Sequence, residues 1–342
     1  MSEVVSRPVS APAHHHDHGA MVRPHHRTLP MKVGTRASPL ALYQTRHFLS
    51  LITQFCPLMR GQKAFEEHQI ITSGDAIQSR RLAEIGGKGL FAKEIHEALL
   101  DGRVDFAVHS LKDLETELPP GIALACVLER EDARDAIILG AGVEDAVDPG
   151  NPLASLPHGA LIGTSSVRRQ AQLLAVRPDL RIGMMRGNVQ TRLARVHGGH
   201  VSATLLAIAG LKRLEMEREA DLVLEPEIMV PAACQGIIGI TVREDDDELR
   251  ELLGAIQHFP SMAVAQAERA LLGALDGSCR TPIGAYARLL PEGRMRLTGL
   301  IARADGSFLL KREVEGLARD GARMGRELGL ELGCDSPADV FG

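Results

Sequence analysis

Short apolar runs separated by polar turns recur along most of the chain, and they predict alternating strands and helices. The clearest run is residues 104–108, in which large apolar residues alternate with small or polar ones. β-Branched and aromatic residues at every second position favour a strand. Ser110, Lys112 and Asp113 follow directly, at the predicted carboxyl end of that strand. Because ligands of open α/β sheets bind at such strand ends, we expect a site here.

The residues from 31 to 113 predict the order strand, helix, strand, helix, strand. Ser38 and Pro39 mark the start of the first helix, because serine caps helices and proline suits the first helical position. This order favours a parallel sheet with helices outside it. The strands are predicted at 31–35, 67–72 and 104–108. The residues spaced for the inward face of the first helix are Leu40, Tyr43, His47, Leu51 and Phe55.

A second α/β unit is predicted after residue 160. Its strands are expected at 161–164, 181–185 and 203–209. The charged run 129–135 precedes this unit and lacks apolar periodicity, so we interpret it as a solvated crossing between domains. Residues 226–233 lead back, and the apolar strand 237–242 is expected to complete the first sheet. The chain then forms two lobes joined by two crossings, as in hinge-type binding proteins.

The C-terminal pattern differs and predicts a smaller α+β domain. Two helices after residue 245 are followed by an antiparallel meander and a closing helix at about 319–332. The meander strands are expected at 283–290, 295–303 and 308–315. Just before them, the Gly- and Pro-containing loop 277–282 exposes Cys279. A polar loop suits a reactive or modified thiol better than a small buried hydrophobe.

Composition narrows the possible functions. A net charge of −5 and an aromatic content of 3% argue against nucleic-acid binding by bulk charge or base stacking. The five cysteines form no CxxC pair and no zinc spacing, so we expect no metal and a reduced, cytoplasmic environment. Neither a membrane helix nor a signal-peptide core is predicted. Residues 1–30, rich in histidine, are expected to be a disordered tail.

Arginines follow several of the predicted strands. The helix dipole disfavours cations in a first turn, so Arg168 and Arg169 indicate an anion site. The excess of 32 Arg over 7 Lys fits bidentate anion binding or a GC-rich genome equally well. The Gly-rich stretch around Lys88 lacks the residues of a phosphate loop and predicts a lid with one cation. From these patterns alone, a two-lobed enzyme and a non-catalytic binding protein for a polyanionic small molecule both remain open.

Seven segments in a fixed order resemble the porphobilinogen deaminase (hydroxymethylbilane synthase) family. Together they are highly specific and span nearly all of residues 31–342. They are TRASPLA at 35–41, GGKGLF at 86–91, AVHSLKD at 107–113, GTSSVRR at 163–169, RGNV at 186–189, AGLKRL at 209–214 and Cys279.

The resemblance implies an α/β fold of two periplasmic-binding-protein-like lobes and a third, smaller α+β domain that carries the cofactor cysteine. Domain 1 would span 31–130 and 235–255, domain 2 would span 134–231, and domain 3 would span 259–342. It implies a cytoplasmic, monomeric transferase of heme biosynthesis with no nucleic-acid or membrane partner. The enzyme would join four porphobilinogen units, with loss of ammonia, to a covalent dipyrromethane cofactor and release hydroxymethylbilane by hydrolysis.

The resemblance also implies residue roles. Asp113 matches the catalytic carboxylate, which would stabilise the cationic azafulvene formed as ammonia leaves. Cys279 would hold the dipyrromethane by a thioether. Each pyrrole carries two carboxylates, and the Arg residues would bind them. The further cofactor-binding residues implied are Lys112, Ser110, Ser166, Arg168, Arg169 and Asp113 itself. The substrate-binding residues implied are Arg36, Ser38, Lys88, Arg186, Arg192 and Arg213.

Three departures from the family pattern involve four residues. Glu84 stands where many members have a lysine, so the lid carries less positive charge here. Leu114 and Glu115 replace a common Val-Pro after the catalytic aspartate, and Cys234 replaces a usual glycine before Gln235. The last two changes are expected to affect turn geometry alone.

Overall fold

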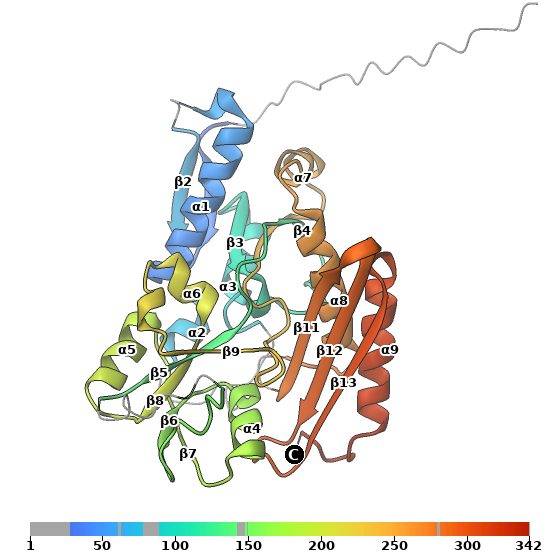
Figure 1. Ribbon diagram of the computed structural model, residues 1–342. Helices are drawn as coiled ribbons and strands as arrows, with labels where there is room; N and C mark the ends of the chain where they lie inside the picture. Colours follow the sequence, from blue (N-terminus) through green and yellow to red (C-terminus); the bar gives the residue numbers. More distant parts are fainter. Residues whose placement is uncertain are drawn as a thin grey trace, which may run out of the picture.

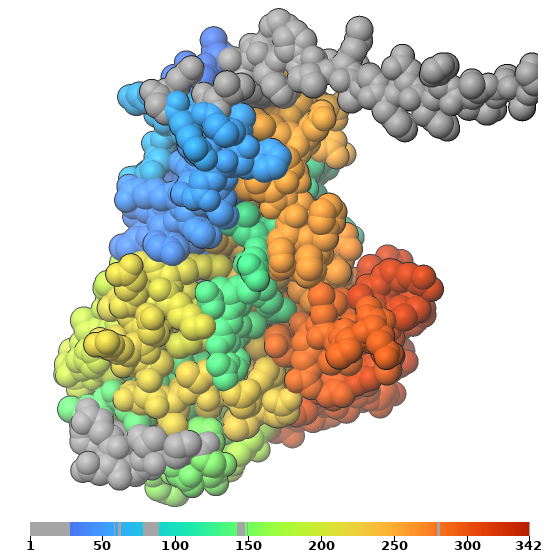
Figure 2. Space-filling model, turned by 45° about the horizontal axis from the view of Figure 1, so that its top comes forward, coloured from blue at the N-terminus to red at the C-terminus, as the bar shows by residue number. Residues whose placement is uncertain are grey.

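The computed structural model describes residues 28–60, 63–77, 89–141, 148, 150–278 and 281–341. Within them the chain forms three sheets, two of five strands and one of three (Figure 1). In the space-filling view, the green and yellow second lobe and the orange and red third domain lie side by side below the blue part of the first lobe (Figure 2). Most of the His-rich tail, Lys88 in the predicted lid, and Cys279 lie outside the described residues.

The first lobe has a mixed five-stranded sheet. Its strand order is β2-β1-β3-β10-β4, and β10 runs antiparallel to both of its neighbours. The parallel pairing expected for the strands within 31–113 is confirmed for β1 with β2 and with β3, and the expectation that the returning strand completes the first sheet is confirmed as well. The strands are β1 (Met31–Thr35), β2 (Phe65–Gln69), β3 (Phe106–Ser110), β4 (Ile122–Val127) and β10 (Ile238–Arg243).

Helix α1 (Pro39–Phe55) begins where expected, with Ser38 as its N-cap, but it buries a different face. Tyr43 and Phe55 are exposed. The buried residues are Ala41, Gln44, Thr45, Phe48 and Ile52. The hydrophobic pattern missed this face because two of its members are polar. Thr45 satisfies its hydroxyl on the Ala41 carbonyl, 3.0 Å away, and Gln44 exchanges hydrogen bonds with Ser110.

The second lobe has the strand order β7-β6-β8-β5-β9, with β5 antiparallel to β8. The charged run 129–135 does not stay solvated to its end, because Asp135 is 0% exposed and begins β5. The strands of the second lobe are β5 (Asp135–Leu139), β6 (Leu161–Gly163), β7 (Arg181–Gly183), β8 (Ala203–Ala207) and β9 (Leu222–Leu224). Its helices are α4 (Val167–Val176), α5 (Val189–His197) and α6 (Ile208–Arg213).

The third domain confirms the predicted meander of β11 (Ile283–Leu290), β12 (Arg294–Ala302) and β13 (Leu309–Leu317). Helices α8 (Phe259–Ala274) and α9 (Gly321–Cys334) pack against this sheet and against each other (Figure 1). A Cβ atom at Gly325 would lie 2.1 Å from the Ala267 carbonyl oxygen, so the helices approach this closely only with glycine there. The remaining helices are α2 (Ser73–Ala76), α3 (Lys93–Leu100) and α7 (Asp247–Gly254).

A buried glutamate joins the crossings to the third domain. Glu268 of α8 is fully buried and accepts hydrogen bonds from the Arg130 guanidinium at 2.6 Å and from the Cys234 and Ala287 main-chain N–H groups, each at 2.6 Å. Cys234 has φ +62°, the left-handed region in which glycine is unstrained. The expected effect of this cysteine on turn geometry is therefore visible in the backbone, and Glu268 helps to hold that turn.

Candidate active site

A cavity of about 540 Å³ lies between the two lobes and reaches the third domain. Among the described residues, six basic and two acidic side chains line it, so its charge favours an anionic ligand. The basic residues are Arg36, Lys112, Arg168, Arg169, Arg186 and Arg192, and the acidic ones are Asp75 and Asp113. None of the described residues forms a cluster of His, Cys, Asp and Glu that could hold a metal ion.

Asp113 ends the single turn Leu111–Asp113 that follows β3. Its carboxylate lies 3.7 Å from the Arg36 guanidinium. Arg36 also bonds to both carboxylate oxygens of Asp75, and its guanidinium stacks on the Phe91 ring at 4.3 Å. Arg36 is thus held in place by Asp75 and Phe91 and presents its remaining edge to Asp113.

Lys112 faces the crossing between the lobes. Its ammonium donates to the Gln235 side-chain oxygen at 3.4 Å. The amide nitrogen of Gln235 donates to the Ala133 carbonyl at 2.7 Å and to Asp135 at 2.9 Å, which fixes the orientation of the amide. Burial lowers the pKa of Lys112 to about 8, against the opposing effect of Asp113. Lys112 is therefore a cation at neutral pH that loses its proton at mildly alkaline pH.

Arg168 and Arg169 are only 4% and 6% exposed, because both bind Asp135. Arg168 lies 2.8 Å and Arg169 lies 2.7 Å from its two carboxylate oxygens. Burial alone would raise the pKa of Asp135, but the two guanidinium groups hold it well below its usual range. Asp135, which the sequence pattern placed in a solvated run, is therefore a tertiary partner of both arginines.

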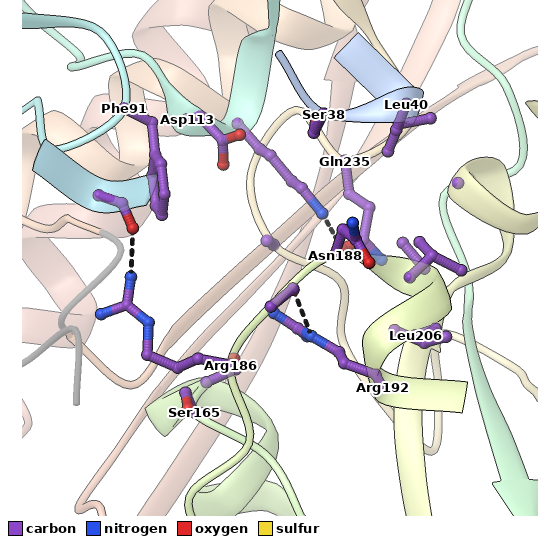
Figure 3. A pocket seen from close by; sticks show the side chains of 18 of the residues that line it. Ser38, Leu40, Phe91, Asp113, Ser165, Arg186, Asn188, Arg192, Leu206 and Gln235 are labelled. Atoms are coloured by element: carbon purple, nitrogen blue, oxygen red, sulfur yellow. Dashed lines mark hydrogen bonds between the residues drawn. The ribbon is translucent and has the colours of Figure 1, made fainter. Parts of the chain in front are cut away.

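Arg186 and Arg192 extend the positive wall along the second lobe (Figure 3). Arg186 donates across the cleft to the Gly74 carbonyl at 2.7 Å and so joins the lobes. Arg192 donates to the Gly187 carbonyl at 3.0 Å, and it forms no ion pair with any residue that the structure describes. Burial, with Arg169 and Arg186 nearby, lowers the pKa of Arg192 to about 10. An anionic ligand would relieve this cost, so Arg192 is the cation best suited to receive one.

The remaining predicted residues divide into two groups. Ser38 and Ser166 line the cavity and cap α1 and α4. Ser110 and Arg213 are not among the described residues that line it, because Ser110 is bonded to Gln44 and Arg213 donates to the Gly236 carbonyl at 2.6 Å.

The structure does not describe Lys88 or Cys279. The neighbours of Cys279 are described, and Ser278 and Thr281 both line the cavity. The Thr281 hydroxyl accepts from the Ser278 N–H at 2.9 Å and donates to the Ser278 carbonyl at 2.8 Å. These two bonds hold Ser278 and Thr281 together at the cavity.

Sequence reasoning missed four residues of the site: Asp75, Phe91, Asp135 and Gln235. Asp75 follows β2 just as Asp113 follows β3, so its position after a strand was a usable signal. Asp135 is followed by the apolar run 136–139, which indicates a strand beginning at the aspartate. Nothing in the pattern singled out Phe91 or the bridging amide of Gln235.

Cations on two facing lobes, one carboxylate at a strand end and a loop from a third domain define a cleft built for a polyanionic organic ligand. Sequence comparisons identify the family. The profile described as porphobilinogen deaminase, dipyromethane cofactor binding domain, matches residues 31–251, and that of the porphobilinogen deaminase C-terminal domain matches residues 262–333. The chain belongs to the porphobilinogen deaminase family, so it is an enzyme rather than a non-catalytic binding protein, and the expected dipyrromethane cofactor is confirmed.

Curated relatives agree over nearly their whole length. The porphobilinogen deaminase of Paracoccus denitrificans is 46% identical over 312 residues, which cover 91% of this chain and 96% of that protein. The porphobilinogen deaminase of Sorangium cellulosum is 45% identical over 306 residues, covering 88% of this chain and 98% of that protein. Among solved structures, an arginine-specific periplasmic binding protein of Salmonella typhimurium covers 66% of this chain and 90% of its own, with 14% identity and a TM-score of 0.37.

Proposed function

We propose that Asp113 is the catalytic carboxylate of a hydroxymethylbilane synthase that joins four porphobilinogen units, with loss of ammonia, and releases the product by hydrolysis. The observation that carries this role is the position of Asp113 at the strand end, in a cavity where the other acidic residue that the structure describes, Asp75, is bound by both oxygens to Arg36. When ammonia leaves the substrate, positive charge develops in a cleft lined mostly by cations. A fixed carboxylate stabilises that charge without reorganising.

The cations of the cavity are proposed to hold carboxylate groups. Each dipyrromethane or porphobilinogen ring carries two, and the donor set fits them because guanidinium groups bind carboxylates bidentately. When bound, the dipyrromethane supplies the pyrrole to which the substrate units are joined. Lys112, Ser166, Arg168 and Arg169 would hold it, with Asp113 on its pyrrole N–H groups.

Substrate carboxylates would meet a second group of residues, which are Arg36, Ser38, Arg186, Arg192 and, from the lid, Lys88. Ser110 and Arg213 support this site from behind. Ser110 fixes Gln44 beneath the turn of Asp113, and Arg213 holds the main chain beside Gln235. Neither contact needs a ligand, so both side chains are set before substrate binds.

We propose Cys279 as the attachment point of the cofactor. Its neighbours Ser278 and Thr281 line the cavity. Cys126 and Cys234 suit the role poorly because they are buried, and burial raises the pKa of each thiol to about 12. None of the described helices is long and apolar enough to span a membrane. We propose a cytoplasmic monomer with domain limits at 31–130 plus 235–255, 134–231 and 259–342.

Intact-protein mass tests the attachment directly. The wild-type chain should exceed its sequence mass by one dipyrromethane, and Cys279→Ala should have the bare mass and no activity. Cys334→Ala is the matched control, because Cys334 is an exposed cysteine of the same domain, and it should keep the added mass. An adduct that persists in Cys279→Ala, or full activity without an adduct, would place the cofactor elsewhere.

A further inference from the structure

Arg269 of α8 makes a contact that none of the roles above explains. Its Nη2 donates to the main-chain carbonyls of Glu115 at 2.6 Å and Thr116 at 2.8 Å. These are the second and third residues after Asp113. Among the described residues Arg269 forms no ion pair, and burial lowers its pKa. A half-buried cation is therefore bonded to two neutral carbonyls. Because burying this cation costs free energy, we expect the position of the loop that it holds to matter.

The loop after Asp113 needs such support. Residues 114–121 form neither helix nor strand. The side chains of Leu111 and Leu114 anchor the start of this stretch in the same apolar cluster as Ala265 and Leu271 of α8. A Cβ atom at Gly273 would lie 3.8 Å from Thr116, so α8 passes directly along the loop. The helix thus contacts the turn of Asp113 through apolar packing on one side and through Arg269 on the other.

The same helix leads to the cofactor loop. α8 ends at Ala274, five residues before Cys279. The Gly277 N–H donates to the Leu272 carbonyl at 2.8 Å, which ties the start of the loop back to the helix. Arg269 and Cys279 are therefore connected by little more than one helical turn and one short loop. A rigid helix transmits position, so what is fixed to α8 at Arg269 is fixed relative to Gly277, which is bonded to Leu272.

We propose that Arg269 is a positioning residue that holds the turn of Asp113 against α8, the helix that precedes the proposed attachment point of the primer. This inference rests on the proposed roles of Asp113 and Cys279. Arginine suits the task because its planar group offers several N–H donors in a fixed geometry, whereas lysine is a point charge on a flexible stem. Reacting groups must be held closely, since a displacement of about 1 Å costs about 100-fold in rate.

The test compares Arg269→Lys with Arg243→Lys. Arg243 of β10 is a matched control, because its Nη1 donates to two main-chain carbonyls, those of Leu99 and Val104, at 2.9 and 3.0 Å. That contact lies at the opposite end of β3 from Asp113. For both variants, primer loading is measured by intact mass, kcat and KM are measured per loaded molecule, and hydrogen exchange is measured over 114–121.

Arg269→Lys should load primer, lose at least about tenfold in kcat with KM changed less than about twofold, and exchange faster over 114–121. Arg243→Lys should keep kcat per loaded molecule whatever its melting temperature. If Arg269→Lys melts lower but keeps kcat and exchange, the contact is only structural and the inference is wrong. If Arg269→Lys fails to fold, Arg269→Gln, whose amide has two N–H donors, is measured in the same way.

Asp113→Asn, measured in parallel, distinguishes a failure of the positioning role of Arg269 from a failure of the proposed catalytic site. Loss of turnover in Asp113→Asn together with normal turnover in Arg269→Lys overturns only the positioning role. Normal turnover in Asp113→Asn overturns the proposed site itself, and the positioning role with it.

Discussion

Arg168 and Asp135 form a buried ion pair of 2.8 Å beside the cavity, and Arg169 binds the other oxygen of the same carboxylate. Asp135 neutralises only one of the two positive charges, so the two arginines together present a net positive charge to the cleft. Both also donate to main-chain carbonyls of the second lobe, Arg168 to Val230 and Arg169 to Leu205. They are part of the framework of that lobe as well as of its ligand site.

Arg168→Met should therefore lower stability as well as turnover. It removes a charged hydrogen bond from a buried carboxylate, a loss of about 2–3 kcal/mol. Chemical denaturation measures the free energy of unfolding, and turnover is measured per folded molecule. Unchanged stability would mean that Asp135 does not depend on Arg168.

Arg192→Met should weaken substrate binding without lowering stability. Arg192 forms no ion pair within the described residues, and burial beside Arg169 and Arg186 lowers its pKa to about 10. Removing this strained cation should leave the melting temperature unchanged or raised, while KM for porphobilinogen rises. A lower melting temperature with a normal KM would make Arg192 a structural residue.

Lys112 should control the alkaline side of the pH profile. Its pKa of about 8 means that the folded enzyme loses this cation as pH rises through 8. We expect kcat/KM to fall above pH 8 in the wild-type enzyme. In Lys112→Arg the cation persists, so this fall should be absent even if the maximum is lower.

Lys112 also predicts a change in stability with a definite sign. The pKa is lower in the folded state than the unfolded value of 10.5, so the unfolded chain binds more protons between pH 8 and 10.5. The contribution of Lys112 to stability should therefore increase across that range. For the pH profile of activity, an alkaline fall in kcat/KM that persists in Lys112→Arg would mean that a group other than Lys112 causes that fall.

A pair of buried histidines should make the first lobe acid-sensitive. His96 of α3 is 3% exposed, neither ring nitrogen has a hydrogen-bond partner among the described residues, and the ring lies 5.8 Å from that of His109. Burial lowers the pKa of His96 to about 4. Burial, with His96 and Arg36 nearby, lowers the pKa of His109 to about 3. The unfolded chain binds protons on these groups first, so stability should fall as pH drops below about 6.5.

Between pH 6.5 and 5, each imidazole should cost about 2 kcal/mol, at 1.36 kcal/mol per pH unit. His96→Leu should remove its share of this loss and raise stability at neutral pH, because no hydrogen bond is broken. His158→Leu, at an exposed position, is the control and should leave the acid slope unchanged. If stability falls equally with decreasing pH in both variants, His96 does not contribute to the acid sensitivity.

The hydrophobic pattern predicted the order of elements well, because strands and helices bury apolar residues at regular spacing. It failed where polar residues are buried. Gln44 and Thr45 on the inner face of α1, and Asp135 at the start of β5, are satisfied by partners on other elements, which are Ser110, Thr35 and Arg168. Such pairings depend on tertiary structure, so a local pattern treats them as surface.

The residues of the site were likewise predicted only in part. Residues at strand ends, including Arg36, Lys112 and Asp113, were predicted because parallel strands bring their carboxyl ends together. The bridging role of Gln235 and the contact of Arg186 with Gly74 were not, because each forms only when two lobes meet across the cleft. Sequence pattern thus identified the cations of the cavity and Asp113, but neither Asp75 nor the contacts that hold these groups.

Asp113→Asn tests the central claim most directly. It keeps the size of the side chain and removes the charge that we propose stabilises the cation formed as ammonia leaves. Removing one such group costs about 10²–10³ in rate. Substrate carboxylates keep their arginine partners, so binding should survive better than turnover.

The measurement is the rate of tetrapyrrole formation per folded, cofactor-loaded molecule, with bound porphobilinogen units counted by intact mass. We predict a loss of at least about 100-fold, with porphobilinogen-derived mass retained on the protein. Tetrapyrrole formation at close to the wild-type rate would contradict a catalytic role for Asp113 and leave the cavity as a binding site only.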